Sequence, residues 1–277
     1  MASWCERCFD LRRQAEAWGE QDREGRRSPP TAVGATSDRQ TSASTIQKTV
    51  LVHRLDRERW RPTVEVVPGA FHVSGALSLE VQRALVEACR TLIDGPVPGY
   101  VPTVRGGGTM HVRMLCLGRH WNGTTYTYEP TRTDFDGLPV PPVPDTFRAL
   151  ARSCAESVGM TLDADVCILN YYNAGGRMGL HQDKDERERS LAAGLPVVSI
   201  SLGDTARFLF GGLRRRDPVE TLALESGDVF IFGGPARLRY HGVSRTIPRT
   251  APPGLALAGR FNLTLRQYDE MPRVNVT

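Results

Sequence analysis

Hydrophobic and polar positions divide the chain into a first segment without a regular pattern and a long segment in which apolar positions recur. Up to about residue 61 strongly apolar side chains are few, and residues 25–49 are rich in Ser, Thr, Gly, Pro and Ala. Such a stretch cannot bury enough apolar surface to offset the entropy lost on ordering. We therefore expect residues 1–61 to form a disordered or weakly structured extension, and residues 62–277 to form one folded domain.

Two parts of this domain have the apolar spacing of a helix. Ser78 is expected to begin the first helix, which runs to about Leu92. Its predicted apolar stripe consists of Leu79, Ala84, Leu85, Ala88 and Leu92. The second helix is predicted over residues 145–159, with Gly159 as its C-terminal cap. One side of it carries Phe147, Leu150, Ala151, Cys154 and Val158.

From residue 166 onward, short apolar or alternating runs predict strands separated by glycine-containing turns. These runs are VCILNYY, PVVSISL, ARFLF, TLALESGDVFIF and GRFNLTLRQY. Residues 64–67 form a shorter apolar run, residues 109–117 predict another strand, and residues 121–128 predict a hairpin with an Asn-Gly turn. Many short strands combined with two helices indicate an α+β protein with a mainly β core. The expected architecture is a double-stranded β-helix (jelly-roll) with supporting helices.

Composition changes this picture little. The 277 residues are 40% hydrophobic and 24% charged, which is typical of a soluble globular protein. No apolar run reaches the roughly 18 residues of a membrane span, and the first residues lack the apolar stretch of a secretory signal, so we expect a cytoplasmic protein without membrane contact. The net charge of +4 permits an anionic partner. Six cysteines are too few for a disulfide scaffold, and the isolated Cys5–Cys8 pair is weak evidence for zinc.

The first candidate site is the His-Gln-Asp sequence at residues 181–183. His181 and Asp183 lie two residues apart, so on an extended segment their side chains point the same way. His241, farther along the chain, is the candidate third ligand. Two histidines and one carboxylate form the facial triad of non-haem Fe(II) oxygenases, which leaves positions open for a co-substrate and O₂. His-x-Asp alone is weak evidence, because the segment KDERER that follows also fits a turn carrying surface charges.

The last predicted strand carries a second candidate site. Its polar face consists of Arg260, Asn262, Thr264 and Arg266, and its apolar face of Phe261, Leu263 and Leu265. Two guanidinium groups are too polar for a core wall without an anionic partner, although a solvent-facing edge strand would also fit the pattern. Beside an iron site a dicarboxylate is the natural ligand, because arginine pairs bidentately with carboxylates. Asn170 and Tyr172 share a strand face and are expected to add hydrogen bonds.

These motifs together resemble one known family. The segments LNYYNAGGRMGLHQDKDE, PVVSISLG, FLFGGLRRRDPVETLALESGDVFIFGGPARLRYHGV and GRFNLTLRQY are similar to the AlkB family of alkylated nucleic-acid repair dioxygenases, especially its bacterial members. The resemblance covers roughly residues 62–268. It implies that His181, Asp183 and His241 hold Fe(II). It also implies that 2-oxoglutarate is bound by Asn170, Tyr172, Arg260, Asn262 and Arg266, one arginine clamping the distal carboxylate and the other supporting the metal-chelating end.

The resemblance extends to the substrate side. It implies an N-terminal nucleotide-recognition lid at about residues 99–136, in front of a jelly-roll core at about residues 164–268. In the family, a tryptophan and the first iron-ligand histidine sandwich the flipped base, which assigns this role to Trp121 and His181. Asp185 would then read the exocyclic nitrogen of the base. Met110 and Tyr126 would belong to the lid, the latter near the nucleic-acid backbone. Structural alternatives are a core position for Trp121 and a surface position for Asp185.

The implied function is oxidative demethylation of N-alkylated bases of the 1-methyladenine and 3-methylcytosine type, with release of formaldehyde. Expected cofactors are Fe(II), 2-oxoglutarate as co-substrate and O₂. We expect a monomer that acts on alkylated DNA. Single strands are the preferred substrate, and RNA is a second one. Residues 121–126 are shorter than in the bacterial relatives and the loop after Asp185 is longer, so lesion preference is less secure than the chemistry. Two alternatives stay open: an oxygenase of the same chemistry acting on a protein or small molecule, and a non-catalytic nucleic-acid binder.

Overall fold

The computed structural model describes residues 63–269. The predicted extension at residues 1–61, with Cys5 and Cys8, lies outside the described residues. None of the helices between residues 63 and 269 is long and apolar enough to cross a membrane.

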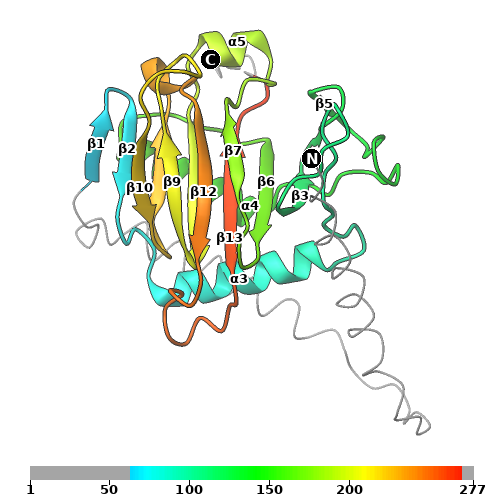
Figure 1. Cartoon of the computed structure of the whole chain (residues 1–277), viewed down its shortest axis with the longest axis horizontal. Helices are drawn as coiled ribbons and strands as arrows, with labels where there is room; N and C mark the ends of the chain where they lie inside the picture. Colours follow the sequence, from blue (N-terminus) through cyan, green and yellow to red (C-terminus); the bar gives the residue numbers. More distant parts are fainter. Residues whose placement is uncertain (1–62, 270–277) are drawn as a thin grey trace, which may run out of the picture. The chain divides into compact units, whose positions relative to one another are not determined.

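Two antiparallel sheets form the body of the molecule (Figure 1). The large sheet has the order β1 (Thr63–Val67), β2 (Ala70–Val73), β11 (Val229–Phe232), β8 (Val197–Gly203), β13 (Arg260–Arg266), β6 (Val166–Tyr172) and β3 (Arg113–Leu117). The small sheet has the order β10 (Glu220–Leu224), β9 (Thr205–Phe210), β12 (His241–Ile247) and β7 (Met178–His181). This arrangement confirms the predicted mainly-β jelly-roll core.

Strand β11 of the large sheet is covered on both faces, because its alternate residues enter two different apolar clusters. Phe230 and Phe232 of β11 pack between the sheets against Phe208 and Phe210 of β9. Val229 and Ile231, which point to the other face of the sheet, join the apolar cluster that also contains residues of the two long helices. A strand buried on both faces has no polar side, which explains why the sequence shows continuous apolar runs here.

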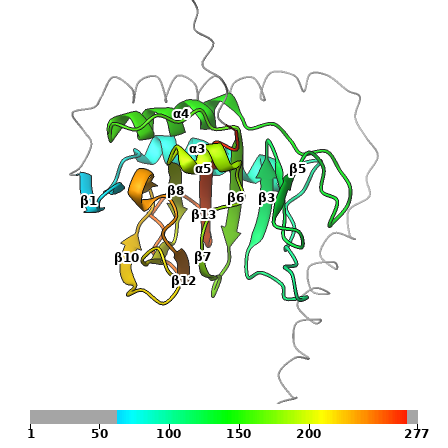
Figure 2. The same ribbon diagram turned by 90° about the horizontal axis from the view of Figure 1, so that it is seen from above.

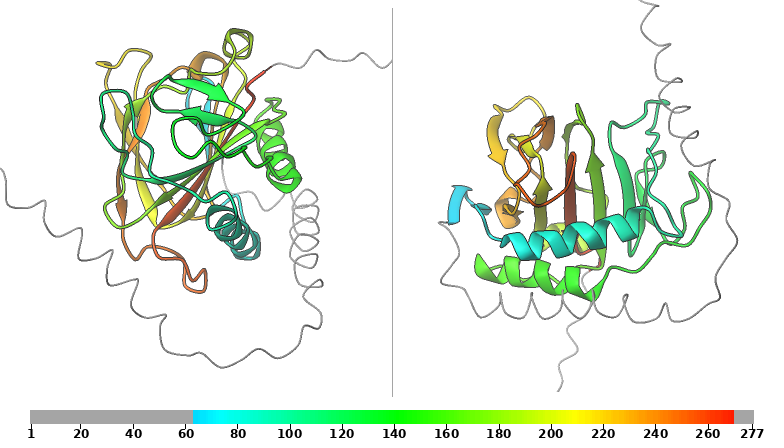
Figure 3. Two further views of the ribbon diagram at one scale, coloured as in Figure 1. Left: turned by 90° about the vertical axis from the view of Figure 1, so that its right-hand side faces the viewer. Right: turned by 90° about the horizontal axis from the view of Figure 1, so that it is seen from below.

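Helices α3 (Leu79–Ile93) and α4 (Asp145–Ser157) cover the outer face of the large sheet (Figures 2 and 3). Ser78 caps α3 as predicted, accepting a hydrogen bond from the Val81 amide at 3.3 Å. Gly159 follows α4 with φ +75°, as predicted for a C-terminal cap. The predicted stripe of α3 is partly confirmed: Leu85 is fully buried, and Leu79, Ala88 and Leu92 are partly buried against the same core cluster. The fully buried apolar residues that the prediction missed are Val81, Val86, Cys89 and Ile93.

The segment that we predict to be the lid, residues 99–136, contains the predicted hairpin, formed by β4 (His120–Asn122) and β5 (Thr127–Glu129). The predicted strand at residues 109–117 is shorter than expected, because Thr109 makes only an isolated bridge to Thr103 and β3 begins at Arg113. Strand β2 was not predicted, because its four residues are too few to show a pattern; it pairs with β1 on one side and with β11 on the other. Two short helical segments, α5 (Glu188–Ala192) and the 3₁₀ turn η2 (Gly234–Ala236), complete the described elements.

Candidate active site

A cavity of about 590 Å³ opens between the two sheets and the lid. This volume lies within the usual range for small-molecule sites, roughly 300–1,000 Å³. All twelve side chains that the sequence singled out line it: Met110, Trp121, Tyr126, Asn170, Tyr172, His181, Asp183, Asp185, His241, Arg260, Asn262 and Arg266. Candidate metal, dicarboxylate and substrate residues therefore share a single space.

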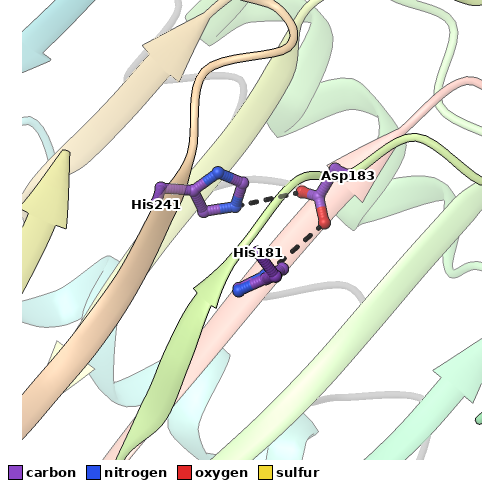
Figure 4. A group of neighbouring side chains, drawn as sticks. All are labelled: His181, Asp183 and His241. Carbon is purple, nitrogen blue, oxygen red and sulfur yellow. Dashed lines mark ion pairs between the residues drawn. The ribbon is translucent and has the colours of Figure 1, made fainter. Parts of the chain in front are cut away.

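Three potential metal ligands meet at the end of the small sheet (Figure 4). His181 ends β7, His241 begins β12, and the two residues are paired in register. Nε2 of His181 lies 3.7 Å from Oδ1 of Asp183, and Nε2 of His241 lies 3.5 Å from Oδ2. One ligand atom from each residue falls within 4.8 Å of the others. Gly242 permits this close approach, because a Cβ atom there would lie only 2.7 Å from the carbonyl oxygen of Met178.

Both imidazoles are oriented by their own strands. Nδ1 of His181 lies 2.9 Å from the carbonyl oxygen of Gly179, and Nδ1 of His241 lies 3.1 Å from that of Arg239. These contacts place the proton on Nδ1 and leave Nε2 free as a ligand atom, as is usual for metal-binding histidines. About a third of the His181 side chain is exposed, yet loss of hydration and then proximity to His241 lower its pKa to about 4. The imidazole is therefore neutral at pH 7, as metal binding requires.

Asp183 is the charged member of this group. Burial alone would raise its pKa, but the Arg266 guanidinium and the His241 imidazole outweigh burial and hold the pKa well below its ordinary value. Arg266 Nη1 lies 3.1 Å from Oδ1, whereas Oδ2 has no hydrogen-bond partner among residues 63–269. Two imidazole nitrogens and one ionised carboxylate oxygen fit Fe(II).

The polar face of β13 forms the floor of the same cavity. Arg260 pairs in register with Tyr172, and Asn262 with Asn170, so the predicted dicarboxylate ligands lie side by side on two neighbouring strands. Asn170 Oδ1 is buried without a hydrogen-bond partner in the described part of the chain. The Tyr172 hydroxyl donates only a weak hydrogen bond, to Sδ of Met178 at 3.9 Å, among the described residues. These side chains retain polar groups that a ligand in the cavity can use.

Arg260 and Arg266 differ in the groups that surround their positive charges. Arg260 is 1% exposed, and its hydrogen bonds go to Ser201 Oγ at 2.7 Å and to the carbonyl oxygens of Asp204 and Leu224 at 3.2 Å. Burial lowers its pKa to about 10, and no ion pair reaches it within residues 63–269. A buried cation with only uncharged partners fits a site for a carboxylate ligand. Arg266 is instead held at the metal end by the carboxylate of Asp183.

The lid reaches this cavity through Trp121. Its indole Nε1 donates a hydrogen bond to Oδ2 of Asp185 at 2.7 Å, and its ring lies 5.7 Å from that of Tyr126. Burial raises the pKa of Asp185, although the Trp121 hydrogen bond acts in the opposite direction. Trp121 is only partly buried and Tyr126 is 39% exposed, so the lid presents aromatic surface to the cavity.

Two charged residues beside the site were not identified from the sequence. Glu186 belongs to the segment KDERER, which also fitted a surface turn, but it is 6% exposed and pairs with Arg266 at 3.0 Å. Its other partner is Arg237, which is 3% exposed. Both lie on segments between strands, where no period indicates which side chains point inward.

Comparisons with known proteins agree with this geometry. Residues 69–266 match the model of the 2OG-Fe(II) oxygenase superfamily. An alpha-ketoglutarate-dependent dioxygenase AlkB homolog of Caulobacter vibrioides is 41% identical over 207 residues, which cover 73% of this chain and 89% of that protein. The DNA N(6)-methyladenine demethylase ALKBH1C of Arabidopsis thaliana is 41% identical over 222 residues, covering 73% of this chain and 49% of that protein.

A solved structure, that of OsALKBH1, has a TM-score of 0.70 and 39% identity, covering 74% of this chain and all of that one. The chain spans only 48–60% of the length of the three Arabidopsis relatives it matches. Sequence, fold and site geometry agree, and the chain belongs to the AlkB family of Fe(II)- and 2-oxoglutarate-dependent dioxygenases.

Proposed function

We propose that this protein oxidatively demethylates N-alkylated bases in nucleic acid, with DNA as the main substrate and RNA as a second one. The observation that carries the proposal is that an aromatic lid residue, Trp121, and the iron triad line one cavity. An oxygenase for small molecules needs no exposed aromatic pair at the entrance, and a non-catalytic binder needs no iron triad. We further infer that residues 62–277 form the catalytic unit, with residues 99–136 as its lid.

His181, Asp183 and His241 would hold Fe(II). Arg260 would clamp the distal carboxylate of 2-oxoglutarate, because its buried charge has no anionic partner among the described residues. Arg266, which contacts Asp183, would support the metal-chelating end of the co-substrate. The remaining contacts would come from Asn170, Tyr172 and Asn262, which line the cavity between these two ends.

Bound Fe(II), with 2-oxoglutarate and O₂, supplies the oxidation: succinate and CO₂ are formed, and one oxygen atom enters a C–H bond of the N-methyl group. The resulting hydroxymethyl group leaves as formaldehyde: the ring nitrogen keeps the electron pair of the broken C–N bond, and the hydroxyl proton is released. The protein orients the methyl group and excludes water from it. The target base must first leave the stack, at a cost of a few kcal/mol that is lowest for a lesion unable to pair.

Trp121 and His181 would stack on the two faces of the flipped base, while Asp185 would accept a hydrogen bond from its exocyclic nitrogen. The Trp121 indole already occupies Oδ2 of Asp185, so Oδ1 is the oxygen left for the base. Met110 would pack against the base from the lid side, and Tyr126 would lie near the nucleic-acid backbone.

1-Methyladenine and 3-methylcytosine are the lesions we propose first. N6-Methyladenine is a second candidate, because two of the Arabidopsis relatives, 41% and 36% identical, are named DNA N(6)-methyladenine demethylases. Three single-stranded oligonucleotides, each carrying one of these bases, test the proposal directly. Purified protein, Fe(II) and 2-oxoglutarate should remove the methyl group from at least one, as measured by mass spectrometry together with succinate. Succinate formation that none of the three stimulates, with no methyl loss, would refute the proposal.

A further inference from the structure

Arg237 and Glu186 form a buried ion pair behind the metal ligands. The Nη2 atom of Arg237 lies 3.0 Å from Oε2 of Glu186, and the two side chains are almost completely buried. Neither residue lines the cavity. Any influence they have on the reaction must therefore be transmitted through other residues.

The pair connects the two chain segments that carry all three metal ligands. Glu186 follows His181 and Asp183 on the segment between β7 and α5. Arg237 directly follows η2, on the segment between β11 and β12 that leads to His241. A second contact joins the same two segments, because Gln182 Nε2 donates a hydrogen bond to the carbonyl oxygen of Leu238 at 2.5 Å.

Arg237 also contacts a metal ligand directly. Its Nη1 donates to the main-chain carbonyl oxygen of Asp183, and its Nε donates to that of Leu195 at 2.8 Å. The planar guanidinium therefore fixes three acceptors at once: two backbone oxygens and one carboxylate. Arg237 therefore holds the backbone of Asp183 directly.

Glu186 acts on the same ligand through Arg266. Oε1 of Glu186 lies 3.0 Å from Nη1 of Arg266, and that nitrogen also lies 3.1 Å from Oδ1 of Asp183. The chain of contacts therefore runs from Arg237 through Glu186 and Arg266 to the carboxylate of Asp183. Two guanidinium groups balance two carboxylates, so the cluster is neutral although it is buried.

We infer that Glu186 and Arg237 are positioning residues for the metal centre, holding Asp183 and the two ligand-bearing segments at the spacing that Fe(II) requires. A purely structural pair would affect the stability of the fold and nothing else. A positioning pair must in addition change metal affinity, because outer partners of metal ligands typically contribute about 10–100-fold to binding. The inference rests on the metal site proposed above.

Metal affinity separates these two roles. Co(II) is titrated into the metal-free full chain by calorimetry, and 2-oxoglutarate is then titrated at saturating Co(II). Arg237→Gln should weaken Co(II) binding by about tenfold or more, while the dissociation constant of 2-oxoglutarate changes by less than about threefold. Arg237→Lys, which keeps the charge but loses the planar fork, should fall between this variant and the wild type.

Arg132→Gln is the matched control. Arg132 is also fully buried and paired with a carboxylate, that of Asp136, but its other contacts, with Pro98, Tyr100 and Phe135, do not include the metal-bearing segments. The Arg132→Gln variant should have a lower melting temperature and a Co(II) affinity within about threefold of the wild type. If Arg237→Gln does not fold, Glu186→Gln, which has the same side-chain shape, replaces it with the same expected loss.

Three results would overturn the inference: a folded variant with Co(II) affinity within about threefold of the wild type, an equal loss in Arg132→Gln, or an equal loss of 2-oxoglutarate affinity. Failure of the wild-type protein to bind Co(II) would instead refute the proposed metal site. The two failures are therefore distinguishable in one set of titrations.

Discussion

The indole nitrogen of Trp121 donates a 2.7 Å hydrogen bond to the carboxylate of Asp185, joining the lid hairpin to the segment that carries two metal ligands. Trp121 lies on β4, and Asp185 lies two residues beyond Asp183. The β4–β5 hairpin is thus tied to the segment that follows β7. A base that stacks on Trp121 therefore meets a ring whose orientation is set from the metal side of the cavity.

Replacement of Trp121 tests the stacking role. Trp121→Ala should weaken binding of a methylated oligonucleotide by about tenfold to a hundredfold, since base–aromatic stacking contributes about 1–3 kcal/mol. Trp121→Phe keeps an aromatic face without the N–H donor, so it should lose less affinity. Fluorescence anisotropy with a labelled oligonucleotide measures both. Uncoupled conversion of 2-oxoglutarate to succinate should survive in Trp121→Ala. Loss of that conversion with normal oligonucleotide binding would mean that Trp121 is a core residue.

Replacement of Arg260 tests the dicarboxylate site. Arg260→Ala should raise the KM for 2-oxoglutarate by about thirtyfold or more, because losing one partner of a buried charge pair costs about 2–5 kcal/mol. Arg245→Ala, on the exposed side of β12, is the control and should leave this KM unchanged. The KM is obtained from succinate formation over a range of 2-oxoglutarate concentrations. An unchanged KM in Arg260→Ala would exclude Arg260 as the clamp.

Replacement of Asp183 tests the metal site. Asp183→Ala should abolish demethylation and Co(II) binding while far-ultraviolet circular dichroism stays that of a folded β protein, because a site missing one of three ligands holds metal poorly. In the wild-type protein, removal of metal by a chelator should abolish turnover, and added Fe(II) should restore it. Full activity of purified Asp183→Ala would contradict the iron assignment.

Thiol reactivity tests the burial of the cysteines. Cys89, Cys116, Cys154 and Cys167 are free and buried, and burial raises the pKa of Cys116 to about 11 and that of Cys154 to about 12. Since the thiolate is the reactive form and forms only as the pH rises toward these values, none of the four should react with iodoacetamide at pH 8 in the folded protein. All six cysteines should react after denaturation. Mass spectrometry of the alkylated peptides identifies each site, and rapid labelling of Cys154 in the folded protein would contradict the packing of α4.

Deletion of residues 1–55 tests the predicted domain boundary. Melting temperature and turnover should remain nearly unchanged, because a segment poor in apolar side chains adds little to a core. The truncated and full-length chains are compared by thermal unfolding and by the demethylation assay. A fall in melting temperature of several degrees would place the boundary earlier in the chain.

The sequence predicted the site better than it predicted the surroundings of the site. Arg260, Asn262 and Arg266 were recognisable because a strand alternates its faces, so their shared orientation follows from their spacing. Strand β2 was missed because four residues are too few to show an alternating pattern, although it forms a hairpin with the neighbouring β1. Glu186 was not identified because a carboxylate in a run of charges looks exposed until the buried arginine that it meets is known.

Gly242 has a consequence for how this protein can change over evolution. With no side chain of its own, it allows β12 to lie against the Met178 and Gly179 carbonyl oxygens, at distances that any Cβ atom would violate. Even alanine would push apart the strands that present His241 and His181, although position 242 supplies no ligand atom. Backbone geometry therefore allows only glycine at position 242. A protein lineage that loses this glycine would be expected to lose the iron chemistry while keeping the barrel.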